Sequence, residues 1–340
     1  MDDLSAWRRQ LTQPLILAAC LVSLTASAQT LPPIDIGGAP EPPVDIASLV
    51  AHLRSPSTDP IDDYPSELFE LAALGPAAGP EAGETVTALL ASPRPYLRAM
   101  AAAALGFMQY APARKRLQEA LSDETDAATS AYAAMSLGRL GDRAALPALR
   151  EAARSYWYPP VRKVASKAID QIETHAPLAP FVRTDWIFPG SLYYATGCPT
   201  TERPMVPTTL TVEGGRLYGI DNGEFGGGLF FDDGHGGVQK IGEMNVQGIA
   251  TLGSHIVAVT GLAHMGWVRG DVYRVERNAS GRWQAIQWRH LPYAPYGAVA
   301  EPGRLRIVLP RADILLSGDG KFSMATCPDT HHGEWRQRVG

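Results

Sequence analysis

The sequence has few cysteines, little excess charge and none of the short motifs that mark common catalytic or metal sites. Charged residues make up 19% of the 340 residues and the net charge is −5, so the basic patch of a nucleic-acid binder is missing. No HExxH, CxxC or GxSxG spacing occurs, and no loop has the oxygen pattern of an EF-hand. We therefore expect no nucleic-acid partner, no metal and no cofactor.

The chain also lacks an apolar run long enough to span a bilayer, which takes about 18 residues or more. Arg8 and Arg9 precede a shorter apolar run that ends in Ala26-Ser27-Ala28. This pattern predicts a signal peptide over residues 1–28 and an exported chain, periplasmic or secreted, with no membrane span after cleavage. A transmembrane anchor is one alternative. A lipoprotein anchored at Cys20 is the other, because Leu17-Ala18-Ala19-Cys20 resembles a bacterial lipobox.

Only 3 cysteines are present in the whole sequence. Removal of the signal peptide leaves Cys198 and Cys327, an even number in an oxidising compartment. We expect a disulfide between them, and two buried free thiols are the alternative. The bond would close a loop of roughly 130 residues and contribute on the order of 4 kcal/mol in the chain-entropy model.

What the first half does contain is a repeat at an offset of 32 residues. Leu105-Gly106 falls on Leu137-Gly138, and Arg98 falls on Ser130 and then on Arg162. Within each unit apolar residues recur every three or four positions, which is typical of a helix with one buried face. Each unit is therefore predicted to be a helical hairpin, and stacked hairpins share one core.

The predicted first helices lie near 46–54, 82–91, 112–121 and 144–154, and the second helices near 65–75, 95–108, 127–140 and 160–173. The run LGRLGDRAALPALREAA, followed by PPVRKVASKAI, resembles the short HEAT-like repeats of the phycobilin lyases. The resemblance covers roughly residues 46–174 and implies an α-solenoid that serves as a binding scaffold. Lyase activity is not expected, because no matching catalytic motif is present.

The second half changes to short alternating or β-branched runs bounded by Gly, Asn and Asp, which are typical of strands. Gly215, Gly253 and Gly303 each open a similar unit of four antiparallel strands, at spacings of 38 and 50 residues. These spacings are close to one propeller blade of about 40–50 residues. We expect a small or partial β-propeller, with a β-sandwich as the alternative.

The resulting fold class is a multidomain α + β chain, with an α-solenoid followed by an antiparallel all-β domain. The predicted order is a signal peptide (1–28), a Pro-rich linker (29–45), the solenoid (46–174), a linker (175–190) and the β-domain (191–340).

Loops that join second to third strands should emerge at the same end as loops that join one unit to the next. Aromatic, histidine and charged side chains on such loops are suited to binding. The candidate binding residues are Asp221, Glu224, His264, Trp267, Arg269, His290, Tyr293, Tyr296 and Arg311.

These features favour an exported, non-enzymatic binding or scaffold protein for a protein or cell-envelope partner. An inhibitor or immunity protein of a secreted toxin is one version of this hypothesis. The competing class is a hydrolase or lyase with His264 as base and Asp221 or Glu224 as its partner, which requires a carboxylate or hydroxyl within about 3 Å of His264.

The disulfide prediction is tested by the mass of the mature protein under non-reducing conditions. We expect a chain two hydrogens lighter than the dithiol form, and a free-energy loss on the order of 4 kcal/mol on reduction. Cys198→Ser should abolish both effects. Two thiols that react with maleimide in the untreated native or unfolded protein would contradict the pairing.

Overall fold

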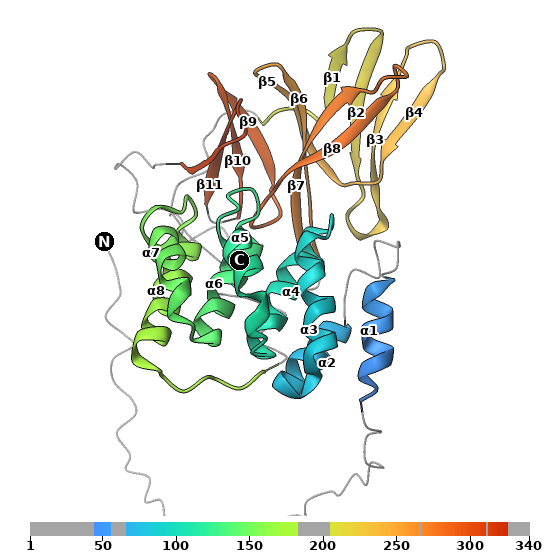
Figure 1. The fold of residues 1–340 in the computed structure, drawn as a ribbon. Helices are drawn as coiled ribbons and strands as arrows, with labels where there is room; N and C mark the ends of the chain where they lie inside the picture. Colours follow the sequence, from blue (N-terminus) through green and yellow to red (C-terminus); the bar gives the residue numbers. More distant parts are fainter. Residues whose placement is uncertain (1–43, 56–65, 183–204, 265–266, 311, 326–340) are drawn as a thin grey trace, which may run out of the picture. The chain divides into compact units, whose positions relative to one another are not determined.

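The computed structural model describes residues 44–55, 66–182, 205–264, 267–310 and 312–325, apart from the side chains of His264 and Trp267. The predicted Cys198–Cys327 pair, the signal peptide and Arg311 lie outside these residues. Figure 1 labels the helices and strands in chain order. The helices are α1 (Ile46–Arg54), α2 (Ser66–Leu74), α3 (Gly79–Ala88), α4 (Pro95–Phe107), α5 (Arg114–Leu121), α6 (Ala127–Leu140), α7 (Leu146–Ser155) and α8 (Pro159–Thr174), with short 3-10 segments at Gly75–Ala78, Leu89–Ala91, Ala111–Ala113 and Arg143–Ala145.

The helices form two layers. The second helix of each hairpin packs on the next one, so that α2, α4, α6 and α8 follow one another, and α3, α5 and α7 each pack on the second helix of their own hairpin. Residues at twice the 32-residue offset make equivalent bonds: Arg98 Nη1 donates to the Ser92 carbonyl (2.9 Å) and Arg162 Nη1 to the Tyr156 carbonyl (2.7 Å). The HEAT-like helical region predicted from the sequence is confirmed.

Two glycines explain how closely the second helices approach. A Cβ on Gly106 would lie 2.7 Å from the Ser136 Cα, and a Cβ on Gly138 would lie 2.8 Å from the Ala168 Cα. Gly138 lies inside α6, where the missing side chain allows contact with α8. The Leu-Gly pair that marks the repeat is thus a packing feature, because only glycine leaves room for the next backbone.

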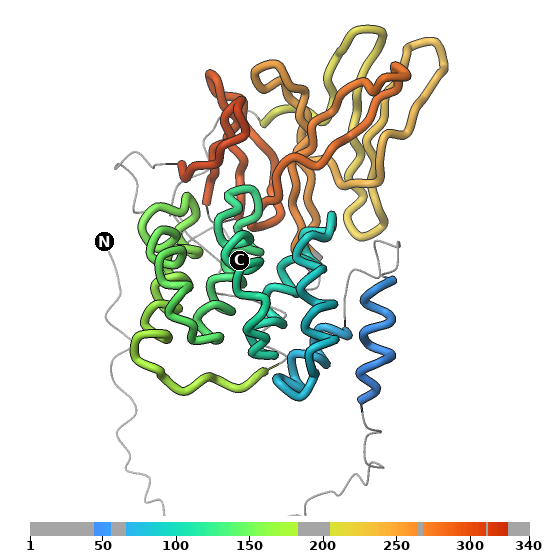
Figure 2. Tube along the Cα trace, in the orientation of Figure 1, coloured from blue at the N-terminus to red at the C-terminus, as the bar shows by residue number. Residues whose placement is uncertain are grey.

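The second half consists of twelve described strands in three antiparallel sheets, which Figure 2 traces as successive back-and-forth runs. Each sheet takes four strands in chain order, and a 3-10 turn at Gly223–Phe225 lies in the loop before β3. The strands are β1 (Thr209–Val212), β2 (Gly215–Asp221), β3 (Gly227–Asp232), β4 (Val238–Gly242), β5 (Val246–Leu252), β6 (His255–His264), β7 (Trp267–Arg277), β8 (Trp283–His290), β9 (Gly297–Glu301), β10 (Arg304–Val308), β11 (Asp313–Ser317) and β12 (Phe322–Met324).

The middle sheet, β5–β8, is buried on both faces. Val257 and Val259 of β6 belong to one apolar cluster with the β9–β12 sheet, whereas Ala258 between them belongs to another cluster with the β1–β4 sheet. A strand covered on both sides needs no polar alternation, which accounts for the continuous run HIVAV. The three units of four antiparallel strands predicted from Gly215, Gly253 and Gly303 are present. The described residues form no closed barrel or propeller.

The glycine contact between α6 and α8 can be tested with Gly138→Ala. We expect a loss of about 1–3 kcal/mol in the free energy of unfolding, measured by chemical denaturation, because the added methyl group overpacks the contact. Adding Ala168→Gly should make the double variant less destabilised than the sum of the two single variants. Additive effects, or no loss in Gly138→Ala, would show that the helices do not meet at these residues.

Candidate functional site

The helical repeats and the β-domain meet at the end of strand β8. The His290 backbone N–H donates to the Thr125 carbonyl (3.0 Å), and Asp126 and His290 form a short parallel β-bridge. Nearby, the ring of Trp157 lies 4.8 Å from that of Phe322, which extends the contact to the third sheet. Residues from both halves of the chain therefore line one site.

On the helical side, the site is built around the carboxylate of Asp126, which is 1% exposed. As the N-cap of α6, it accepts the Thr129 N–H at 3.0 Å, and its other oxygen accepts the Thr129 hydroxyl at 2.6 Å. Arg98 of α4 donates to the same oxygen from Nε (3.0 Å) and Nη2 (2.7 Å). One capping carboxylate thus fixes an arginine of the preceding repeat.

On the β side, His290 and Asp271 form a second buried pair. His290 Nδ1 lies 2.9 Å from Asp271 Oδ1, and Gln287 donates to the same oxygen at 2.6 Å. Asp271 lies on β7 opposite His290 in the β7–β8 ladder, so the strand register alone brings the two side chains together. Burial by itself lowers the pKa of His290, but the hydrogen bond and charge of Asp271, with the charge of Asp126, raise the pKa above its ordinary value.

The pKa of Asp271 shifts in the opposite direction. Burial alone would raise it, but the hydrogen bond and charge of His290, together with the Gln287 hydrogen bond and the charge of Arg269, hold the pKa of the carboxyl below its ordinary value. Both shifts favour an imidazolium–carboxylate ion pair.

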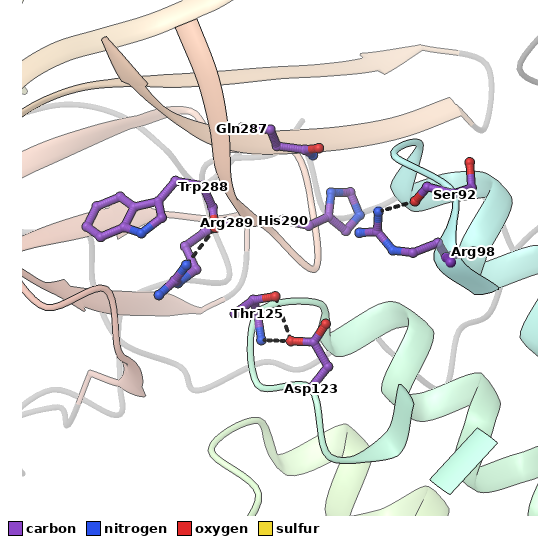
Figure 3. A pocket seen from close by; sticks show the side chains of 9 residues that line it. Ser92, Arg98, Asp123, Thr125, Gln287, Trp288, Arg289 and His290 are labelled. Carbon is purple, nitrogen blue, oxygen red and sulfur yellow. Dashed lines mark hydrogen bonds between the residues drawn. The ribbon is translucent and has the colours of Figure 1, made fainter. Parts of the chain in front are cut away.

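A pocket of about 320 Å³ opens between these two pairs. Figure 3 shows the Arg98 guanidinium and the His290 ring pointing toward one another from α4 and β8. Their opposed donors make this pocket a candidate binding site for a small polar group. The lining residues are Ala91, Ser92, Arg98, Asp123, Thr125, Gln287, Trp288, Arg289 and His290.

The predicted binding residues fall into separate groups. His290 lines this pocket, and Tyr293 follows it in a loop that packs on β7, where the Leu291 N–H donates to the Gly270 carbonyl (2.8 Å). Arg269 is exposed on β7, and Tyr296 is 63% exposed before β9.

A second group of predicted residues lies on the first sheet. Asp221 ends β2 and accepts from Gln247 of β5 at 2.6 Å, while Glu224 is exposed in the turn that follows. The Asn245 side chain donates to the Gly223 carbonyl (2.9 Å), so the loop after β2 lies against the loop that joins the first two sheets. The backbones of His264 and Trp267 face each other at the end of the β6–β7 hairpin, and their side chains lie outside the described residues.

Of the four residues in the two buried pairs, His290 was predicted from the sequence as a site residue, and Asp126, Asp271 and Arg98 were not. Arg98 appeared in the sequence as an aligned repeat position, and its bond to Asp126 joins two successive repeats. The available signal for Asp126 was its position before α6, where a capping residue is expected. Among the described residues no group of three or more His, Cys, Asp or Glu side chains could hold a metal ion, and no described helix is long and apolar enough to cross a membrane.

The fold defines the first half as a repeat protein, and comparison with known proteins agrees. Residues 83–170 match the model of the HEAT repeats. One solved structure, human deoxyhypusine hydroxylase in complex with glycerol, is 24% identical and covers 41% of this chain and 51% of its own, with a TM-score of 0.35. This chain thus spans about half of that protein, and a similarity at this level carries no argument about activity. A search of curated proteins found no match.

The His290–Asp271 pair predicts a specific pH dependence of stability. The pKa of His290 is raised on folding, so its contribution is complete below the unfolded value of about 6.5 and is lost as pH rises through the folded value. The pKa of Asp271 is lowered, so its contribution is lost as pH falls below about 4. A shift of one pKa unit on folding, for either residue, changes the free energy of unfolding by about 1.4 kcal/mol.

Denaturant unfolding between pH 5 and 9 measures this effect. We expect the free energy of unfolding to fall above about pH 6.5 in the unmodified protein. The fall should be much smaller in His290→Asn, which keeps an N–H donor for Asp271 but does not titrate. Parallel curves for the two proteins would contradict the buried ion pair.

Proposed function

We propose that this chain is an exported binding protein that holds a protein or cell-envelope partner on its HEAT-like repeats and β-domain. The observation that carries the proposal is the pocket at the end of β8, because helices and strands both contribute to it. A solenoid supplies a long recognition surface without a reactive group, and the β-domain adds a neighbouring wall with its own polar side chains.

Exposed aromatic side chains on the β-domain loops also support a binding role. Phe225, after β2, is 87% exposed, and Tyr296, before β9, is 63% exposed. Large aromatic side chains are enriched in the centres of protein interfaces, where they bury much area with little loss of entropy. They offer contact surfaces beyond the pocket itself.

The second candidate function is acid–base catalysis, and the specific observation that favours it is the His290–Asp271 pair. A histidine held by a buried carboxylate resembles the base and orienting acid of many hydrolases. Neither hydroxyl in the lining of this pocket bonds to His290, since Ser92 Oγ accepts the Arg94 N–H (3.2 Å) and Thr125 Oγ1 donates to Asp123 (2.6 Å). A raised pKa also leaves a larger fraction of His290 protonated near neutral pH, and a protonated imidazole cannot accept a proton. Binding is therefore the better supported function.

Affinity capture from an envelope extract tests the binding function. The unmodified protein should retain the same component in repeated experiments. Arg289→Glu reverses a charge in the pocket lining and should weaken that retention at least about tenfold. Arg150→Glu reverses a comparable charge on α7 outside the pocket and should leave retention unchanged. Repeated capture of nothing, or equal retention by all three folded proteins, would refute the proposal.

A further inference from the structure

Arg98 has hydrogen-bond donors to spare on the side that faces the pocket. A guanidinium carries five N–H groups, and Arg98 uses Nε and Nη2 for Asp126 and one N–H of Nη1 for the Ser92 carbonyl. One N–H on each terminal nitrogen has no acceptor among the described residues. The Arg98 side chain is only 19% exposed, so these donors are largely shielded from solvent.

The His290 ring presents one more such group. Its Nδ1 is held by Asp271 at 2.9 Å, and no described residue bonds to Nε2. The His290 side chain is 10% exposed and lines the same pocket as Arg98. The two cationic groups point toward one another (Figure 3), and each is paired with a buried carboxylate, Arg98 with Asp126 and His290 with Asp271.

The charge of Arg98 acts on His290 across the pocket, against the larger effects of Asp271 and Asp126. An anion between the two cations would be attracted by both. A planar carboxylate matches two N–H groups of a guanidinium and can accept a third bond from an imidazolium. We propose that the pocket binds an organic carboxylate between Arg98 and His290, supplied by the C-terminus or an acidic side chain of a peptide. This site deepens the binding function proposed above and rests on it.

The other charged groups around the pocket are compatible with such a ligand. Arg289 adds a cation whose described bonds go to the Gly320 and Trp288 carbonyls. Asp123 adds one carboxylate to the lining, and one of its oxygens is occupied by the Thr125 N–H and hydroxyl. The volume of about 320 Å³ exceeds that of a single carboxylate and leaves room for the adjoining peptide atoms.

The test uses four probes on the full chain: N-acetylglycine, the α-amide of N-acetylaspartic acid, N-acetylglycinamide and inorganic phosphate. The first offers a C-terminal carboxylate, the second offers a side-chain carboxylate with the C-terminus blocked, and the third has no charge. The Cε1–H NMR signal of His290, identified by its absence in His290→Asn, reports binding at this site. We expect at least one carboxylate probe to shift this signal with saturation, and the neutral amide to leave it unchanged.

Two variants and one matched control separate the pocket from general charge effects. Arg98→Lys keeps a cation beside Asp126 but removes the paired N–H groups, and His290→Asn keeps a donor toward Asp271 but removes Nε2. Each should weaken carboxylate binding about tenfold or more, measured by calorimetry. Arg162 is the equivalent arginine two repeats further along the chain, and it lies outside the pocket. Arg162→Lys should change the affinity for the carboxylate less than about twofold.

Binding of either carboxylate that is lost in both pocket variants supports the site, and the probe that binds identifies the source of the carboxylate. No saturable shift, binding of phosphate alone, or equal affinity in the folded variants would overturn it. If capture from the extract still depends on Arg289 while no carboxylate binds, the proposed function stands and the carboxylate site falls. Should Arg98→Lys fail to fold, His290→Asn alone decides.

Discussion

The carboxylate of Asp126 is the constraint on which the junction of helices and sheets depends. It caps α6 through Thr129, it holds the guanidinium of Arg98 from the preceding repeat, and its backbone lies in a bridge with His290. With 1% exposure this charge has no water to replace a missing partner. Removal of one member of a buried ion pair typically costs about 3–5 kcal/mol, because the other charge stays uncompensated. The same position thus links local helix geometry to the placement of a strand over 160 residues further along the sequence.

Such a pair gives geometric specificity more than net stability. Burial of both charges is itself costly, and apolar side chains of the same size often stabilise a fold as well or better. What the polar residues provide here is a fixed direction for each cation. Asp126 and Thr129 anchor Arg98 on one wall, and Asp271 and Gln287 anchor His290 on the other. Both cations therefore keep their remaining donors directed at the pocket, as a preorganised site requires.

The helical half was largely predictable from the sequence, because its signal is local and repeated. Apolar spacing placed the helices, and the offset that aligns Arg98 with Arg162 corresponds to equivalent bonds in the structure. The β half was predicted at the level of its three four-stranded units, since a glycine at Gly215, Gly253 or Gly303 lies at or just before the second strand of each. Their assembly was harder to predict, because a strand buried on both faces carries no alternation to show which partner covers it.

The site was only partly predictable for a related reason. His290 was recognised by residue type and its place near a loop, whereas Asp271 was hidden inside a strand and becomes a partner only through the β7–β8 register. Asp126 showed a capping position, but nothing in its neighbourhood indicated contact with β8. Contacts between distant segments follow from tertiary packing, which local pattern does not encode.

The arrangement also couples proton binding to anion binding. The raised pKa of His290 means that its ring stays protonated to a higher pH than a free imidazole. An anion in the pocket therefore contacts a cation over a wider range of pH. The charge of Arg98 lowers the pKa of His290. The bound anion offsets this repulsion. Thermodynamic linkage makes these two effects reciprocal. The free energy by which a bound anion favours protonation of His290 equals the free energy by which protonation of His290 favours anion binding. Since the two walls come from different halves of the chain, occupancy would also stabilise their junction in proportion to ligand concentration.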